Sequence, residues 1–217
     1  MRAFKALNFY MVVIKEVKRN KKSYTIVVGE ETLKNVDVEV ALSYGIREGE
    51  MDTERFKEFL KDNARACAKT YTYGMLARKD RTVKEVREKL YERGFHKDAV
   101  EYAISSVSTY GYLNDEEYAL SYVERALSHK GSYRIRQELK RKGVGEEEIN
   151  LALRDVEFDD QFENALELAK KNLRGKSLED EKVKEKLFRF LASRGYNYDI
   201  IKKVMRSIGA EIEEYSI

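Results

Sequence analysis

The apolar residues of this chain follow one pattern that occurs three times. In each copy a leucine lies four residues before a glycine, a basic residue directly precedes that glycine, and apolar residues follow one and six positions after it. The glycines are Gly94, Gly143 and Gly195, separated by 49 residues (94 to 143) and then by 52 (143 to 195). A register held at this spacing is typical of stacked copies of one helical unit. We therefore expect an elongated array with an extended binding surface rather than a catalytic pocket.

Within each copy, apolar residues recur every three or four positions, as on one face of an amphipathic helix. The pattern predicts three helices per module, and each repeated glycine is expected to cap a helix C-terminus. Thr82–Glu85 and Asn114–Glu117 have the capping-box pattern of helix starts. The predicted helices span residues 52–79, 82–94 and 96–110, then 114–130, 132–142 and 146–155, and then 160–173, 178–194 and 198–207.

The first 50 residues have a different pattern. Tyr10–Ile14 and Tyr24–Val28 are rich in β-branched and aromatic residues and flank a polar basic turn, which predicts a β-hairpin. A short third strand at Thr32–Asn35 and a short helix at Asp37–Tyr44 are expected to follow. The fold class is thus mainly α, with three tandem three-helix modules after a small N-terminal β-hairpin extension. The expected divisions are 1–51, 52–113, 114–157 and 158–217, the last ending in an acidic tail from Gly209.

Composition adds few constraints. The net charge is only +3, so any affinity for nucleic acid must come from local clusters of basic residues. The single cysteine, Cys67, excludes an intramolecular disulfide, and we expect it to be a small, half-buried side chain. No stretch approaches the about 20 apolar residues that span a bilayer, and the first seven residues have no secretory pattern. We expect a cytoplasmic monomer that does not bind membranes.

The sequence offers little for catalysis. The two histidines, His96 and His129, lie in predicted turns and lack the spacing of a metal site. Glycine-rich phosphate loops are absent. The acidic run Asp115–Glu117 is explained by its position at a helix start, where negative charge is favourable. We expect no catalytic residue, no metal and no cofactor.

Basic residues cluster in the first two modules and are the candidate partner-binding surface. They are Arg78, Lys79, Arg81, Lys84, Arg87, Lys130, Arg134, Arg136, Lys140 and Arg141. Arg81, Lys84 and Arg87 recur every three residues and are expected to line one ridge of a helix. One interpretation is a solvated, salt-bridged face, because Glu85, Glu88 and Glu138 are interleaved with them. The other is an electropositive surface for a polyanion or an acidic protein groove, with salt-sensitive contacts.

Six tyrosines offer faces on which nucleic-acid bases stack. They are Tyr110, Tyr112, Tyr118, Tyr122, Tyr133 and Tyr196. Most fall on apolar stripes or beside the cap glycines, so we expect packing to explain most of them.

Three segments together resemble the RecX family of regulatory proteins. Arg78–Leu90 followed by Gly94-Phe95 resembles the start of that family's first repeat. Gly111–Ala119 is similar to its Gly-x-Leu-Asp-Asp-x-x-Phe-Ala motif, with Asn114 in place of the first Asp and Tyr118 in place of Phe. Gly131–Gly143 is similar to its Arg-Ile-x-x-Glu-Leu-x-x-Lys-Gly segment. The match is specific over residues 68–157 and looser in the third module.

The resemblance implies a non-enzymatic protein that binds the RecA–DNA filament and inhibits the recombinase, ATPase and coprotease activities of RecA. It also implies contact with single- or double-stranded DNA without sequence preference. An autonomous DNA-binding protein and a helical-repeat adaptor with an unrelated partner remain alternatives. Tight, salt-sensitive binding to DNA alone would favour the first of these.

Overall fold

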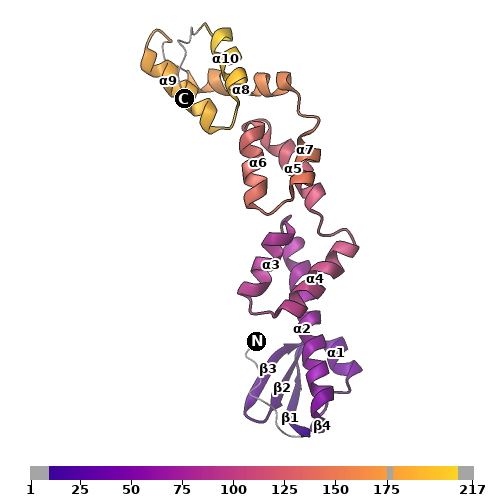
Figure 1. Ribbon diagram of the computed structural model, residues 1–217. Coiled ribbons are helices and arrows are strands. Elements are labelled where there is room, and N and C mark those ends of the chain that lie inside the picture. The colour runs from indigo at the N-terminus through magenta and orange to yellow at the C-terminus, as the bar shows by residue number, and fades with distance from the viewer. Residues whose placement is uncertain (1–9, 175–177, 210–217) are drawn as a thin grey trace. The chain divides into compact units, whose positions relative to one another are not determined.

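The computed structural model describes residues 10–174 and 178–209, which form a small β-sheet and ten helices (Figure 1). The chain divides into two compact units, Met1–Leu113 and Asn114–Ile217. The first holds the sheet and module 1, and the second holds modules 2 and 3. Residues 1–9 and most of the predicted acidic tail, 210–217, lie outside the described residues. None of the helices in the described ranges is both long and apolar enough to cross a membrane.

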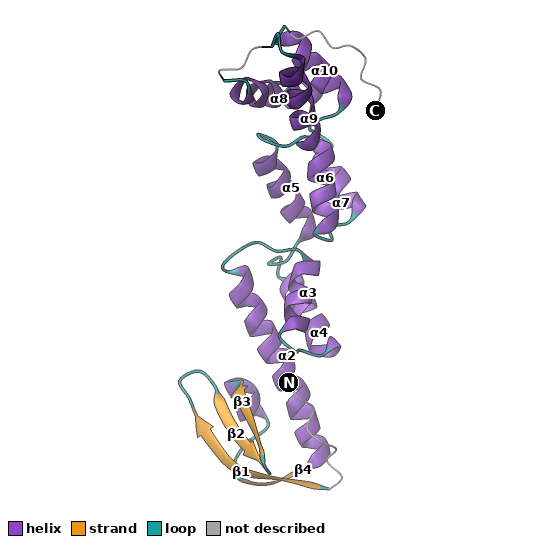
Figure 2. Ribbon diagram, turned by 90° about the vertical axis from the view of Figure 1, so that its left-hand side faces the viewer, coloured by secondary structure: helices purple, strands orange, loops and turns teal. Residues whose placement is uncertain are grey.

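The N-terminal sheet is antiparallel, with strand order β3-β2-β1-β4 (Figure 2). The predicted hairpin is confirmed as β1 (Met11–Arg19) and β2 (Tyr24–Val28), and the third strand as β3 (Glu31–Val36). The short helix is also confirmed, as α1 (Val38–Ser43). Asp37 caps it by accepting hydrogen bonds from the N–H groups of Glu39 and Val40.

A fourth strand was not predicted. The segment β4 (Gly49–Asp52) pairs with residues 11–14 of β1, so the extension is a four-stranded sheet rather than a hairpin. Its sequence lacks the β-branched residues by which strands are recognised. The backbone of β1 supplies its pairing partner, and this long-range contact leaves no local pattern.

One long helix, α2 (Thr53–Leu76), belongs to two hydrophobic cores. Its first turns bury Phe56 and Phe59 against the inner face of the sheet, in a core that includes Ile14 and Ile26. Its later turns bury Ala68 and Met75 in the core of module 1. The sheet and module 1 are therefore built on the same helix, which explains why they form one compact unit.

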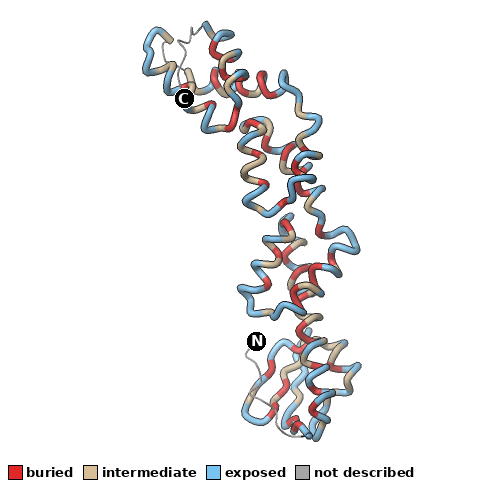
Figure 3. The backbone as a smooth tube through the Cα atoms, viewed as in Figure 1, coloured by how far each residue is buried: buried red, intermediate tan, exposed pale blue. Residues whose placement is uncertain are grey.

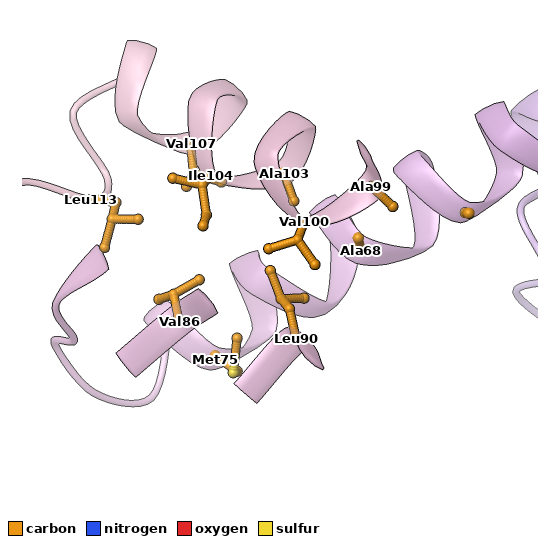
Figure 4. Close-up of a cluster of buried hydrophobic side chains, with 11 residues drawn as sticks. Ala68, Met75, Val86, Leu90, Ala99, Val100, Ala103, Ile104, Val107 and Leu113 are labelled. Atoms are coloured by element: carbon orange, nitrogen blue, oxygen red, sulfur yellow. The ribbon is translucent and has the colours of Figure 1, made fainter. Parts of the chain in front are cut away.

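Module 1 is completed by α3 (Val83–Glu92) and α4 (Lys97–Thr109). Figure 4 shows side chains of all three helices meeting in its core. Helices α2 and α4 run in the same direction. Arg65 in the middle of α2 contacts Asp98 at the start of α4, while the ring of Tyr73 near the end of α2 lies against Tyr112, just beyond α4.

Modules 2 and 3 repeat this arrangement. Module 2 contains α5 (Asp115–Ala126), α6 (Ser132–Arg141) and α7 (Glu146–Leu153). Module 3 contains α8 (Phe158–Asn172), α9 (Glu181–Ser193) and α10 (Tyr198–Ser207). Each has its own cluster of buried side chains, and Figure 3 colours the buried positions along the backbone red. In every module the first and third helices make the most extensive contact. Three three-helix modules behind a small β extension are thus confirmed.

The repeated glycines end the second helix of each module. Gly94, Gly143 and Gly195 have φ of 88°, 83° and 88°, a left-handed conformation in which glycine is strongly preferred. In each module the residue after the glycine donates its N–H to the carbonyl of the leucine that lies four residues before the glycine. The pairs are Phe95 to Leu90 at 3.1 Å, Val144 to Leu139 at 3.2 Å and Tyr196 to Leu191 at 3.3 Å. This is the hydrogen bond of a Schellman cap.

Modules 2 and 3 make specific contacts within the second unit. The N–H of Gly131 donates to the carbonyl of Arg194 at 2.9 Å. The next residue, Ser132, donates its N–H at 3.0 Å to the side-chain oxygen of Gln161, which is buried. A Cβ added to Gly131 would overlap the backbone of Gly195. Glycine at 131 therefore permits the close approach of the two modules.

Replacing Gly131 with Ala should lower the free energy of unfolding by about 1–3 kcal/mol, because the added methyl group collides with backbone that has no freedom to move aside. Gly145→Ala is the matched control. Gly131 and Gly145 are both N-cap residues, with φ of −77° and −69°, but a Cβ at 145 meets only the flexible side chain of Glu148. The control should lose less than about 1 kcal/mol. Urea unfolding measures both, and equal losses would contradict the close contact.

Candidate partner-binding surface

The ten basic residues of the predicted surface differ in exposure and in whether they are held in ion pairs. Arg78 and Lys79 lie in the turn after α2 and are exposed, with no side-chain partner among the described residues. Lys84 in the first turn of α3 and Arg141 at the end of α6 are also exposed. Lys140 on α6 is exposed as well, although it is held in an ion pair.

The predicted ridge of Arg81, Lys84 and Arg87 is shorter than expected. Thr82 is the N-cap of α3, so Arg81 precedes the helix and only Lys84 and Arg87 share it. Arg81 is half-buried, and its Nε is buried without a hydrogen-bond partner among the described residues. Only Lys84 and Arg87 can therefore lie on one ridge of α3, and Arg81 does not extend it.

Arg87 and Arg136 occupy equivalent positions, seven residues before the cap glycine of their modules. The guanidinium of Arg87 donates to both carboxylate oxygens of Glu101 on α4, at 3.0 and 3.1 Å. Arg136 donates to Asn150 on α7 at 2.7 Å and also pairs with Glu146. In both modules the partner lies 14 residues after the arginine (87 to 101, 136 to 150). These arginines join the second helix to the third, and the shared spacing of 14 is the sequence feature that identifies the pairing.

The remaining basic residues of module 2 are also paired. Lys140 binds Glu146 at 2.7 Å. Lys130 and Arg134 both bind Glu138, at 2.6 and 3.1 Å, and Arg134 also donates to the carbonyl of Ser193 in module 3 at 2.7 Å. The salt-bridged interpretation thus describes at least five of the ten residues. In the sequence, Glu138 stands out only as an acidic residue among basic ones. In the structure it binds both Lys130 and Arg134 and is the centre of their network.

The environment of Glu138 changes its titration. Only 20% of its side chain is exposed, and this burial alone would raise its pKa. Hydrogen bonds from Lys130, from the Tyr122 hydroxyl and from Arg134 outweigh the desolvation and lower the pKa to about 2. Glu138 is therefore ionised over the whole physiological pH range and holds two cations in place.

The tyrosines are only partly explained by packing. Tyr118 and Tyr196 are buried and Tyr122 is half-buried, as expected. The expectation is wrong for the other three, which are exposed: Tyr110 at 73%, Tyr112 at 63% and Tyr133 at 65%. Tyr110 and Tyr112 follow α4, outside its apolar stripe. They lie at the same end of module 1 as the Arg78–Lys79 turn, because α2 and α4 are parallel.

The groups with potential catalytic chemistry are isolated. His96 and His129 are exposed, at the start of α4 and between α5 and α6. Burial raises the pKa of the Cys67 thiol to about 11, so it is protonated at neutral pH and reacts slowly as a nucleophile. Over residues 10–174 and 178–209, acidic, histidine and cysteine side chains form no group able to hold a metal ion.

Comparison with known proteins gives the same three-part division. The model of the RecX first three-helix domain matches residues 68–106, that of the second matches 114–153, and that of the third matches 159–205. A regulatory protein RecX from Clostridium perfringens (strain SM101 / Type A) is 34% identical over 195 residues, which cover 88% of this chain and 92% of that protein. One from Clostridioides difficile (strain 630) is 31% identical over 208 residues, covering 94% and 97%.

Solved structures are similar over the same modules. A crystal structure of a regulatory protein RecX has a TM-score of 0.67 at 24% identity and covers 90% of this chain and 99% of its own, which supports the fold. The crystal structure of RecX from Lactobacillus salivarius has a TM-score of 0.62 at 26% identity and covers 68% and 97%.

Replacing Glu138 with Gln should lower the free energy of unfolding at pH 7 by about 2 kcal/mol. The folded-state pKa of about 2 lies below the ordinary value of 4.5. The stabilisation is therefore complete above about pH 4.5 and is lost as the pH falls towards 2. The difference between wild type and variant should shrink over that interval, as measured by urea unfolding at each pH.

Glu88→Gln is the control, because Glu88 is exposed on α3 and has no ion-pair partner among the described residues. It should change stability by less than about 0.5 kcal/mol at every pH. A Glu138→Gln variant that behaves like this control would contradict the role assigned to the network.

Proposed function

This chain belongs to the RecX family, and from that premise we propose that it is a non-enzymatic regulator of the RecA recombinase. It binds the RecA–DNA filament and inhibits the recombinase, ATPase and coprotease activities of RecA. The observation that carries the proposal is the match of all three modules, in order, to the three domains of RecX. The relatives from Clostridium perfringens and Clostridioides difficile, which match along nearly their whole length, are both called regulatory protein RecX.

The charge distribution supports a partner that presents both protein and DNA. The net charge of +3 is small, and five of the ten candidate basic residues share ion pairs with three carboxylates of their own modules. Arg78 and Lys79 are exposed and have no side-chain partner among the described residues, so they remain available to phosphates or acidic side chains. A surface of this kind suits a filament that presents both protein and DNA better than it suits bare DNA, for which a more basic face is typical.

Autonomous binding to DNA is the second candidate, and one observation favours it. The rings of Tyr112 and Tyr73 form a T-shaped contact with 5.5 Å between their centroids, and Tyr112 remains 63% exposed. Together with Tyr110 it lies near the basic turn of Arg78 and Lys79. Exposed aromatic rings beside cations are the components of a platform that stacks single-stranded bases without sequence preference.

The variant Arg78→Glu/Lys79→Glu tests the regulator directly. It should weaken binding to preformed RecA filaments about tenfold, since it reverses two exposed charges that have no side-chain partner among the described residues. Lys18→Glu/Arg19→Glu is the matched control: an adjacent basic pair of equal charge change, exposed at the end of β1 in the same unit. It should bind within about twofold of the wild type. Co-sedimentation with filaments at constant salt measures both.

Equal weakening by the two double variants would mean that only net charge matters, and this surface assignment would be wrong. The same proteins titrated with bare single-stranded DNA separate the two candidates. A regulator should bind filaments much more tightly than bare DNA. An autonomous DNA-binding protein should show equal affinity for both, with a steep decrease as salt is raised.

A further inference from the structure

A hollow of about 430 Å³ lies in the first unit, between the sheet and module 1. Its walls come from the β1–β2 turn, from β3, from α2 and from the turn between α3 and α4. It is separate from the surface discussed above, because none of the ten candidate basic residues lines it. The lining residues that matter below are Lys22, Lys34, Asp37, Asn63, Tyr71 and Arg93.

The hollow is electropositive. Lys22, Lys34 and Arg93 face a single carboxylate, that of Asp37. One oxygen of Asp37 already accepts two backbone hydrogen bonds as the cap of α1, at 3.0 and 3.1 Å. Neither lysine has an ion-pair partner among the described residues, and the guanidinium of Arg93 lies over the ring of Tyr71 at 5.5 Å. Such an arrangement favours an anion.

The side chain of Asn63, a buried residue of α2, also lines the hollow. Asn63 is only 1% exposed, and its Oδ1 accepts the N–H of Asp37 at 2.8 Å. That bond determines which end of the amide is oxygen. The Nδ2 amino group is therefore a donor, and no acceptor for it occurs among the hydrogen bonds of the described residues. This amino group is not among the buried side-chain atoms that lack a partner, so it is open to the hollow and can donate to a ligand oxygen there.

The remaining wall is apolar and neutral. The rings of Tyr71 and Phe95 lie 6.3 Å apart between centroids. The thiol of Cys67, also in the wall, donates to the carbonyl of Asn35 at 3.2 Å. An anion here would therefore meet cations and an amide donor on one side and aromatic surface on the other.

We propose that this hollow binds a phosphate ester of about mononucleotide size. The phosphate is held by Lys22, Lys34 and the amide of Asn63, and the organic part lies against Tyr71 and Phe95. The volume lies within the range of small-molecule sites. An adjoining hollow of about 540 Å³ does not share this character, since Asp37, Glu39 and Asp62 there balance Lys22, Arg65 and Lys69. The proposal does not depend on the function proposed above.

Cys67 provides a local reporter, because it is the only cysteine of the chain and lines the hollow. Its alkylation by iodoacetamide at pH 9 is slow, because the thiol pKa is about 11, and a bound phosphate ester should slow it further by covering the thiol and by raising its pKa. The probes are inorganic phosphate, AMP, adenosine and a short single-stranded oligonucleotide with a 5′-phosphate. AMP at millimolar concentration should slow alkylation about fivefold or more, and adenosine should have little effect.

Lys22→Glu/Lys34→Glu should weaken the protection by AMP about tenfold. Lys15→Glu/Arg47→Glu, exposed residues of the same unit that do not line the hollow, should leave it unchanged. Asn63→Asp keeps the acceptor for Asp37 and removes the amino donor, so it should also abolish protection. Circular dichroism of each variant shows that it is folded.

Protection by the oligonucleotide but not by AMP would support the phosphate site and identify a strand end as its source. Three results would overturn the proposal. The first is no protection by AMP or the oligonucleotide. The second is equal protection by adenosine and AMP, and the third is unchanged protection in folded Lys22→Glu/Lys34→Glu.

Discussion

The cap that joins a buried leucine to a left-handed glycine is the constraint on which each module depends. Leu90, Leu139 and Leu191 are completely buried, so their side chains anchor the second helix in its core. The carbonyl of each leucine also accepts the N–H of the residue after the glycine, which ends the helix at that point. The chain then starts the third helix in the direction that packs it along the first. One short motif therefore positions two helices, and this explains why it recurs while the residues around it vary.

The surfaces around these cores follow from what each helix is joined to. Helix α2 carries both the sheet and module 1, and the hollow of Lys22, Lys34 and Asn63 lies where those two parts meet. In the second unit, Gly131 permits close backbone contact between modules 2 and 3, and Arg134 adds a hydrogen bond across it. Some arginines of this chain thus connect helices or modules to one another rather than projecting into solvent. Counting basic residues alone overestimates the charge that a partner would meet.

Local patterns were sufficient to predict most of the elements. Helix starts at Thr82 and Asn114, the glycine ends and the first three strands all depend on nearby residues, and the structure has them. Strand β4 was missed because its pairing is set by β1, about 40 residues earlier in the chain. Tertiary packing decides that Arg87 pairs with Glu101 and that Tyr110 is exposed. The periodicity of apolar residues within a helix predicts neither. The candidate surface could therefore be located in the sequence but not divided into paired and exposed residues.

The regulator proposed above acts on a RecA filament rather than on DNA. The most direct measurement is the ATPase rate of cognate RecA on single-stranded DNA, titrated with this protein, with binding of the protein to the same DNA measured in parallel. The account predicts that ATPase activity is lost at amounts well below one protein per RecA, while binding to bare DNA stays weak. Loss of activity only at concentrations where the protein coats the DNA would contradict it.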